Sequence, residues 1–73
     1  MKIVNRKIVD FIANEWISKA KSQRAFALDH SIDEKTVRSI KNDPNYSIGL
    51  ETIIKICEAR NIKLSEFFQL VNL

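Results

Sequence analysis

Hydrophobic residues recur at helical spacing along most of the chain. Near the amino terminus, Ile8, Ile12 and Trp16 lie four residues apart, so they share one face of a helix that we predict over residues 4–19. Similar spacing predicts four further helices over residues 23–29, 34–41, 50–60 and 64–71. No run alternates between apolar and polar residues as a half-buried strand does. The pattern therefore predicts an all-α fold, a compact five-helix bundle.

Residues that begin or end helices separate these segments. Ser22 and Asp33 are suitable N-caps for the second and third helices, because their side-chain oxygens can accept from free backbone N–H groups. Asn61 tolerates the left-handed backbone that often follows the last turn of a helix. Residues 42–46 combine Asn, Asp and Pro and form the clearest loop.

The second and third predicted helices are joined by a very short turn. Helices joined so tightly cross at roughly 90–120°, so the first can brace the second. Val37 and Ile40 mark the buried face of the third helix. At roughly 100° per residue, four polar residues gather on the opposite face. They are Lys35, Arg38, Ser39 and Asn42. Such a face suits the major groove of B-DNA, which admits one α-helix.

The segment 22–42 resembles the helix-turn-helix of the lambda-repressor and Cro (XRE-type) family of DNA-binding proteins. The resemblance lies in Ser22-Gln23 at the start of the second helix, Ala27 facing the turn, Ile32 after it, and the inward pair Val37 and Ile40. It continues through residues 49–68, down to the ending Leu64-Ser65-Glu66-Phe67-Phe68. The resemblance implies a single DNA-binding domain over residues 1–73 of the lambda-repressor-like five-helix type.

The chain departs from the family pattern at three places. Ser31 stands where the family usually has a turn glycine, and a left-handed non-glycine residue costs roughly 1–2 kcal/mol. Lys41 replaces a Glu that in many members pairs with an Arg of the first helix, so we expect that ion pair to be absent. Upstream of Ser22 the match is poor, and the first helix is interpreted from its own pattern.

The resemblance implies DNA contacts for individual residues. Glu34, Lys35, Arg38 and Ser39 match positions that face base edges in the family. Arg or Lys suits guanine and Glu suits cytosine, which weakly predicts a G·C-containing half-site, although Glu34 could serve only the helix dipole. Gln23 matches a phosphate-contacting Gln at a helix N-terminus, with an ordinary exposed polar residue as the alternative. The candidates for phosphate contact are Gln23, Lys19, Lys21, Arg24, Lys41 and Asn42.

Charge and composition narrow the function further. The formal net charge of +3 is compatible with nucleic acid but could reflect solubility alone. Cys57 and His30 are single, so we expect no internal disulfide, no metal site and a cytoplasmic protein. There is no glycine-rich phosphate loop, and we expect no enzyme, cofactor or small-molecule ligand. No signal peptide or membrane-spanning run of about 18 apolar residues is present. Tyr46 could cover the core or touch the sugar-phosphate backbone.

A chain of 73 residues has a small core, which rarely contributes more than about 3–5 kcal/mol. The C-terminal segment is more apolar than a free tail, so we expect it to cap the bundle and form a dimer interface. The residues predicted at that interface are Phe68, Val71 and Leu73. A homodimer would bind double-stranded DNA at a palindromic operator, with half-sites roughly 34–36 Å apart.

The leading interpretation is therefore a homodimeric, sequence-specific transcriptional regulator, most simply a repressor. The competing interpretation is a protein-interaction module, such as an antitoxin or accessory regulator, that keeps the fold without specific DNA binding. The missing turn glycine and the acidic Glu34 on the exposed face favour it. Steep salt dependence of binding distinguishes DNA contacts from apolar pairing.

Overall fold

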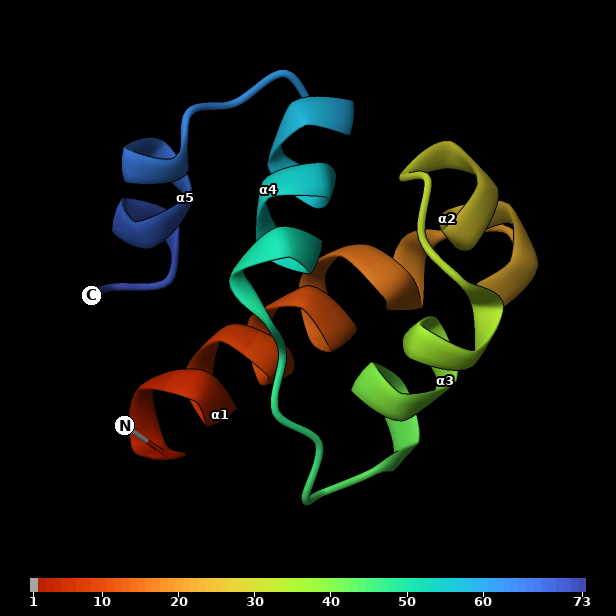
Figure 1. Cartoon of the computed structure of the whole chain (residues 1–73), viewed down its shortest axis with the longest axis horizontal. Helices are drawn as coiled ribbons and strands as arrows, with labels where there is room; N and C mark the ends of the chain where they lie inside the picture. Colours follow the sequence, from red (N-terminus) through yellow and green to blue (C-terminus); the bar gives the residue numbers. More distant parts are fainter. Residues whose placement is uncertain (1) are drawn as a thin grey trace.

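Five α-helices occur in the predicted order in the computed structural model, which describes residues 2–73 (Figure 1). They are α1 Lys2–Phe11, α2 Gln23–Asp29, α3 Glu34–Asn42, α4 Leu50–Ala59 and α5 Leu64–Leu70. The bounds of α2 are those predicted, and α3, α4 and α5 each end within one residue of the prediction. No strand occurs in residues 2–73, and the predicted all-α fold is confirmed. None of the described helices is long and apolar enough to cross a membrane.

The helices divide the molecule into two sides. Figure 1 shows α2 and α3 together on one side and α5 on the other, with α1 and α4 between them. The loop from α3 to α4 passes along the edge of the bundle between these two sides. The helices α3 and α5 thus lie on opposite sides of a bundle whose longest extent is 28 Å.

The first helix changes pitch midway, which the sequence pattern did not predict. A π-helical turn, η1 Ile12–Trp16, and a 3-10 turn, η2 Ile17–Lys19, follow α1. The Ile17 N–H bonds back to the carbonyls of Ala13 and Ile12, and this wide turn brings Ile17 to the buried side. Trp16, predicted to continue the stripe of Ile8 and Ile12, is only half-buried. Trp16 nevertheless packs against the core, as the stripe predicted, and Ile17 is the residue of this turn that is buried.

All five helices and the π turn contribute to one core. The side chains that are almost fully buried are Val9, Ile12, Phe26, Val37, Ile40, Ile56 and Phe67. Burial of each such side chain contributes about 1.5–3 kcal/mol relative to exposure. Phe67 carries α5 into this core, with its ring 5.5 Å from that of Trp16 and 6.0 Å from that of Phe11. Aromatic packing therefore fixes α5 against the first helix.

Three helices end in the same hydrogen-bonded motif. After α2, α4 and α5 a left-handed residue follows, in order Ser31 (φ 57°), Asn61 (φ 56°) and Asn72 (φ 67°). In each case the next N–H donates to the carbonyl five residues earlier, as in a Schellman motif. The pairs are Ile32 to Ala27, Ile62 to Cys57 and Leu73 to Phe68, each at 3.0 Å. Ser31 thus adopts the conformation expected of the family's turn glycine, and the predicted left-handed role of Asn61 is confirmed.

Ser22 and Asp33 both occupy the N-cap positions predicted for them. Ser22 Oγ accepts from the Ala25 N–H at 3.0 Å, which confirms it as the cap of α2. Asp33 has the extended backbone of an N-cap, but its side chain makes no capping hydrogen bond, so that part of the prediction was wrong. Glu34 lies in the first turn of α3, where the helix dipole favours an acid.

Candidate nucleic-acid interface

The third helix has one buried face and one exposed polar face. Val37 and Ile40 are 0% and 1% exposed and hold α3 against the core. Glu34, Lys35 and Arg38 are exposed, and Ser39 is half-buried. The structure therefore leaves the predicted base-contacting side chains outside the core, while packing fixes the opposite face.

An open hollow lies along the end of this exposed face. It is lined by Lys35, Arg38, Ser39, Asn42, Asp43 and Pro44. The structure thus brings together three of the four predicted base-contacting residues and one predicted phosphate-contacting residue. Glu34 lies outside the hollow, in the first turn of α3. This position is compatible with both roles predicted for Glu34, a contact with a base and a favourable interaction with the helix dipole.

The remaining predicted phosphate contacts lie at the start of α2 and the end of α3. Gln23 is the first residue of α2 and is half-buried, and Arg24 beside it is exposed. Lys21 and Lys41 are exposed, as is Lys19. The Lys19 ammonium lies 3.9 Å from a Glu15 carboxylate oxygen, which partly offsets its charge. Such an exposed pair contributes little to stability, so Lys19 is available to another anion.

A buried histidine supports the turn between α2 and α3. His30 is 6% exposed, and its ring stacks on Phe26 at a centroid distance of 3.9 Å. Because Nδ1 lies 2.8 Å from the Phe26 carbonyl oxygen, which can only accept, Nδ1 carries the proton. Nε2 then accepts from Arg60 Nη1 at 3.2 Å, and the guanidinium carbon of Arg60 lies 4.1 Å from the centroid of the Trp16 ring. Sequence reasoning missed Arg60, which joins the end of α4 to the turn.

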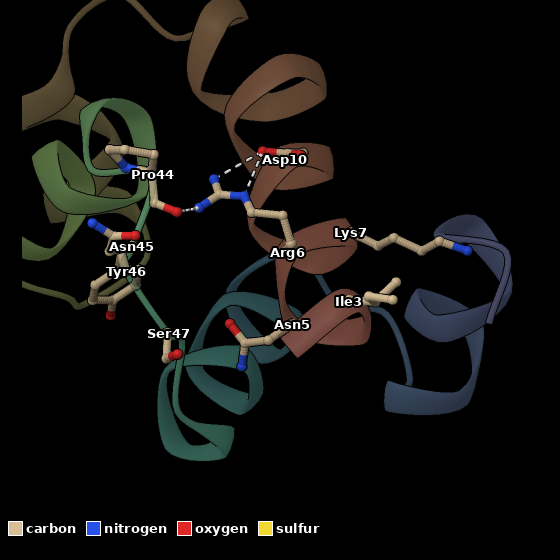
Figure 2. Close-up of a pocket in the computed structure, with 9 residues that line it drawn as sticks. All are labelled: Ile3, Asn5, Arg6, Lys7, Asp10, Pro44, Asn45, Tyr46 and Ser47. Atoms are coloured by element: carbon tan, nitrogen blue, oxygen red, sulfur yellow. Dashed lines mark hydrogen bonds and ion pairs between the residues drawn. The ribbon is translucent and has the colours of Figure 1, made fainter. Parts of the chain in front are cut away.

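The loop after α3 is held at both ends by α1, and Figure 2 shows the contact of Arg6 with Pro44 at the first end. Arg6 Nη1 donates to the carbonyl oxygens of Pro44 at 2.8 Å and Asp43 at 3.4 Å. Asn5 Nδ2 donates to the Ile48 carbonyl at 3.0 Å, and Asn5 Oδ1 accepts from the Ile48 N–H at 2.9 Å. We call these contacts of Asn5 and Arg6 with the backbone of Asp43, Pro44 and Ile48 the α1–loop clamp. Sequence reasoning missed this clamp.

Side chains within the loop add to its order. Asp43 Oδ1 accepts from the Asn45 N–H at 2.9 Å, and the Asp43 carbonyl accepts from the Tyr46 N–H at 3.1 Å. Tyr46 is half-buried against the core, and this burial raises the pKa of Tyr46. Arg6 of α1 forms an ion pair with Asp10, with Nη2 2.8 Å from Asp10 Oδ1.

The residues predicted at a dimer interface fall in two environments. Phe68 and Leu73 line an apolar groove together with residues of α1, α4 and the loop before α4. The other lining residues are Val4, Asn5, Ile8, Ile48, Leu50 and Ile53. Val71 is only 8% exposed and belongs to the core of the single chain. This C-terminal groove includes no residue of α2 or α3 among those that line it.

Cys57 is buried within α4, and this burial raises the pKa of its thiol. Within residues 2–73, no three metal-binding side chains gather closely enough to hold an ion.

The sequence matches the model of a known protein family. A family model described as the Cro/C1-type HTH DNA-binding domain matches residues 17–72, which is more than half of the chain. The chain therefore belongs to the family of Cro/C1-type helix-turn-helix DNA-binding domains, and the resemblance noted in the sequence is confirmed. The match begins at η2 and leaves α1 outside, in keeping with the poor resemblance upstream of Ser22. No curated protein and no solved structure matched the chain.

Proposed function

We propose that this DNA-binding domain is a sequence-specific transcriptional regulator that acts as a homodimeric repressor in the cytoplasm. Each subunit places α3 in the major groove, where Lys35 and Arg38 donate to guanine and Ser39 and Glu34 contact neighbouring bases. The observation that carries the proposal is the exposed polar face of α3, fixed by its buried face in a chain of the Cro/C1-type family. Repression follows most simply from occlusion of a promoter.

Phosphate contacts on both sides of α3 would fix its register. Gln23 lies at the start of α2, where backbone N–H groups favour an anion. Basic and amide side chains at the start of α2 and the end of α3 supply the remaining contacts. They are Lys19, Lys21, Arg24, Lys41 and Asn42. Contacts of this kind position a protein on DNA and carry no sequence information directly.

The C-terminal groove is the surface that we propose for dimerisation. Phe68 and Leu73 line it, and Leu73 is 48% exposed in the single chain. Val71 supports this surface from the core. The groove is lined by residues of α1, α4 and the C-terminal segment and by none of α3. Because α5 lies on the other side of the bundle from α3 (Figure 1), two-fold pairing at the groove would hold the two α3 helices apart. Half-sites one turn apart, roughly 34–36 Å, require that separation and predict a palindromic operator.

Selection of duplexes from a random pool, followed by sequencing, tests the proposal. We expect enrichment of an inverted repeat with G·C pairs in each half-site, at low and at high salt. The logarithm of the binding constant should fall with the logarithm of salt concentration by about 0.9 for each phosphate contacted. A folded protein that enriches no sequence at either salt concentration contradicts specific DNA binding. That result would favour the interaction module instead.

A further inference from the structure

The guanidinium of Arg6 is oriented before it meets the loop. Both Nε and Nη2 donate to Asp10 Oδ1, at 3.0 Å and 2.8 Å, one turn further along α1. This leaves Nη1 directed at the Pro44 carbonyl, as Figure 2 shows. Only the planar, multi-donor fork of arginine can make both sets of bonds with one fixed geometry. Asp10 therefore sets the direction in which Arg6 holds the loop.

The carbonyls that Arg6 holds belong to the rim of the proposed DNA-contacting surface. Asp43 and Pro44 line the same hollow as Lys35, Arg38 and Ser39. The Asp43 N–H also donates to the Ser39 carbonyl at 2.9 Å, which ties this rim to the last turn of α3. A shift of the loop would therefore change the shape of the hollow at Ser39.

We propose that Arg6 and Asn5 are positioning residues for DNA recognition, acting through the α1–loop clamp rather than by touching DNA. Arg6 already has a carboxylate partner in Asp10, and Asn5 uses both ends of its amide on Ile48. Both residues lie in α1, outside the segment 17–72 that matches the family model. This role rests on the proposed function of α3.

A matched pair of substitutions tests the clamp. Arg6 and Lys7 are adjacent residues of α1 and both line the pocket drawn in Figure 2. The substitutions Arg6→Gln and Lys7→Gln therefore each remove one positive charge from the same region. Lys7 is exposed and makes no hydrogen bond or ion pair through its side chain within residues 2–73. The probes are a labelled duplex with the most enriched selected sequence and a duplex with the same bases scrambled. Affinity is measured at a temperature where circular dichroism shows each variant folded.

We expect Arg6→Gln to reduce the preference for the enriched duplex over the scrambled one by about tenfold, the size of effect that remote positioning residues produce. Lys7→Gln should change both affinities equally, by less than about twofold. Arg6→Lys keeps the charge and should lose most of the same preference, because an ammonium cannot hold Asp10 and the loop together. If Arg6→Gln does not fold, Arg6→Lys carries the test.

Hydrogen exchange provides a reading of the loop that is independent of DNA. The Asn5 side chain accepts the Ile48 N–H, so Asn5→Ala should accelerate exchange of that amide and lower the duplex preference as well. A lower unfolding midpoint with unchanged duplex preference would overturn the positioning role. Failure of the wild-type chain to prefer any duplex would instead refute the proposed function, and with it this role. If the wild-type chain prefers the enriched duplex and the clamp variants prefer it equally, the role of the clamp is refuted and the proposed function is not.

Discussion

Ser31 adopts a left-handed backbone conformation in the turn between α2 and α3. Glycine takes this conformation without steric cost, whereas the Cβ of serine approaches a carbonyl oxygen. Asn61 has nearly the same φ at the end of α4, but asparagine tolerates it better because its side chain can bond locally. The backbone conformation is thus nearly the same at Ser31 and Asn61, and the strain that the side chain causes in it should be larger at Ser31.

Ser31→Gly should therefore stabilise the domain by about 1 kcal/mol, because the strain of the left-handed serine exceeds the extra freedom gained by the unfolded chain. Asn61→Gly is the matched control and should change stability by less. The free energy of unfolding in urea measures both. A Ser31→Gly variant less stable than the wild type would contradict the strain.

Substitutions on the proposed DNA-contacting surface should differ in the kind of effect that they have on DNA binding, as well as in its size. Arg38→Ala should relax selectivity at one base position and cost about 1–3 kcal/mol there. Lys21→Ala should weaken all duplexes alike and reduce the salt slope by about one unit. Competition binding with single-base variants of the enriched duplex separates the two. An unchanged base preference in Arg38→Ala would remove that residue from the base-contacting set.

Among the elements, α2 to α5 could be predicted closely because local signals mark their ends. Ser22, Asp33, Pro44 and Asn61 each change the backbone at a helix boundary. The π turn could not be predicted, because Trp16 and Ile17 are both apolar and either could continue the stripe from Ile12. Packing decides between them: Ile17 enters the core, while Trp16 lies between Phe67 and Arg60.

The caps of α2 and α3 should differ in their contribution to stability. Ser22→Ala removes the bond from the Ala25 N–H and should cost about 1 kcal/mol, which is large for a helix of seven residues. Asp33→Ala should cost clearly less, because the Asp33 side chain makes no capping bond. Thermal unfolding of the two variants under one condition compares them. Equal losses would mean that Asp33 caps α3 in solution.

On the scale of the whole molecule, the helix-turn-helix could be predicted from sequence but its supports could not. The polar face of α3 follows from residue spacing within one helix. Arg6 and Pro44 are 38 positions apart, and Arg60 and His30 are 30 apart. No local pattern links such pairs, and each meets only after the bundle has formed. Sequence therefore indicated the surface that we propose for DNA contact, and it missed the contacts that hold this surface in shape.

The proposed dimer makes a prediction at this scale. Leu73→Glu places a charge on an exposed position of the C-terminal groove and should yield a folded monomer that binds the operator weakly. Val71→Glu is the contrasting variant and should unfold the chain, because an unpaired carboxylate in the core is strongly disfavoured. Sedimentation velocity measures the association state and circular dichroism the fold. A dimeric Leu73→Glu protein would exclude the groove as the interface.

Trp16 and Tyr46 are the only residues of their kinds in the chain, and each occupies a different joint of the bundle. The Trp16 indole lies against Phe67 and under Arg60, where α5 and α4 meet the first helix. The Tyr46 phenol lies in the loop after α3. The protein thus carries two built-in optical reporters that need no label. Indole emission should change when α5 separates from the first helix. Phenol absorption should change when the loop beside the proposed DNA-contacting surface moves, so one sample can distinguish the two events.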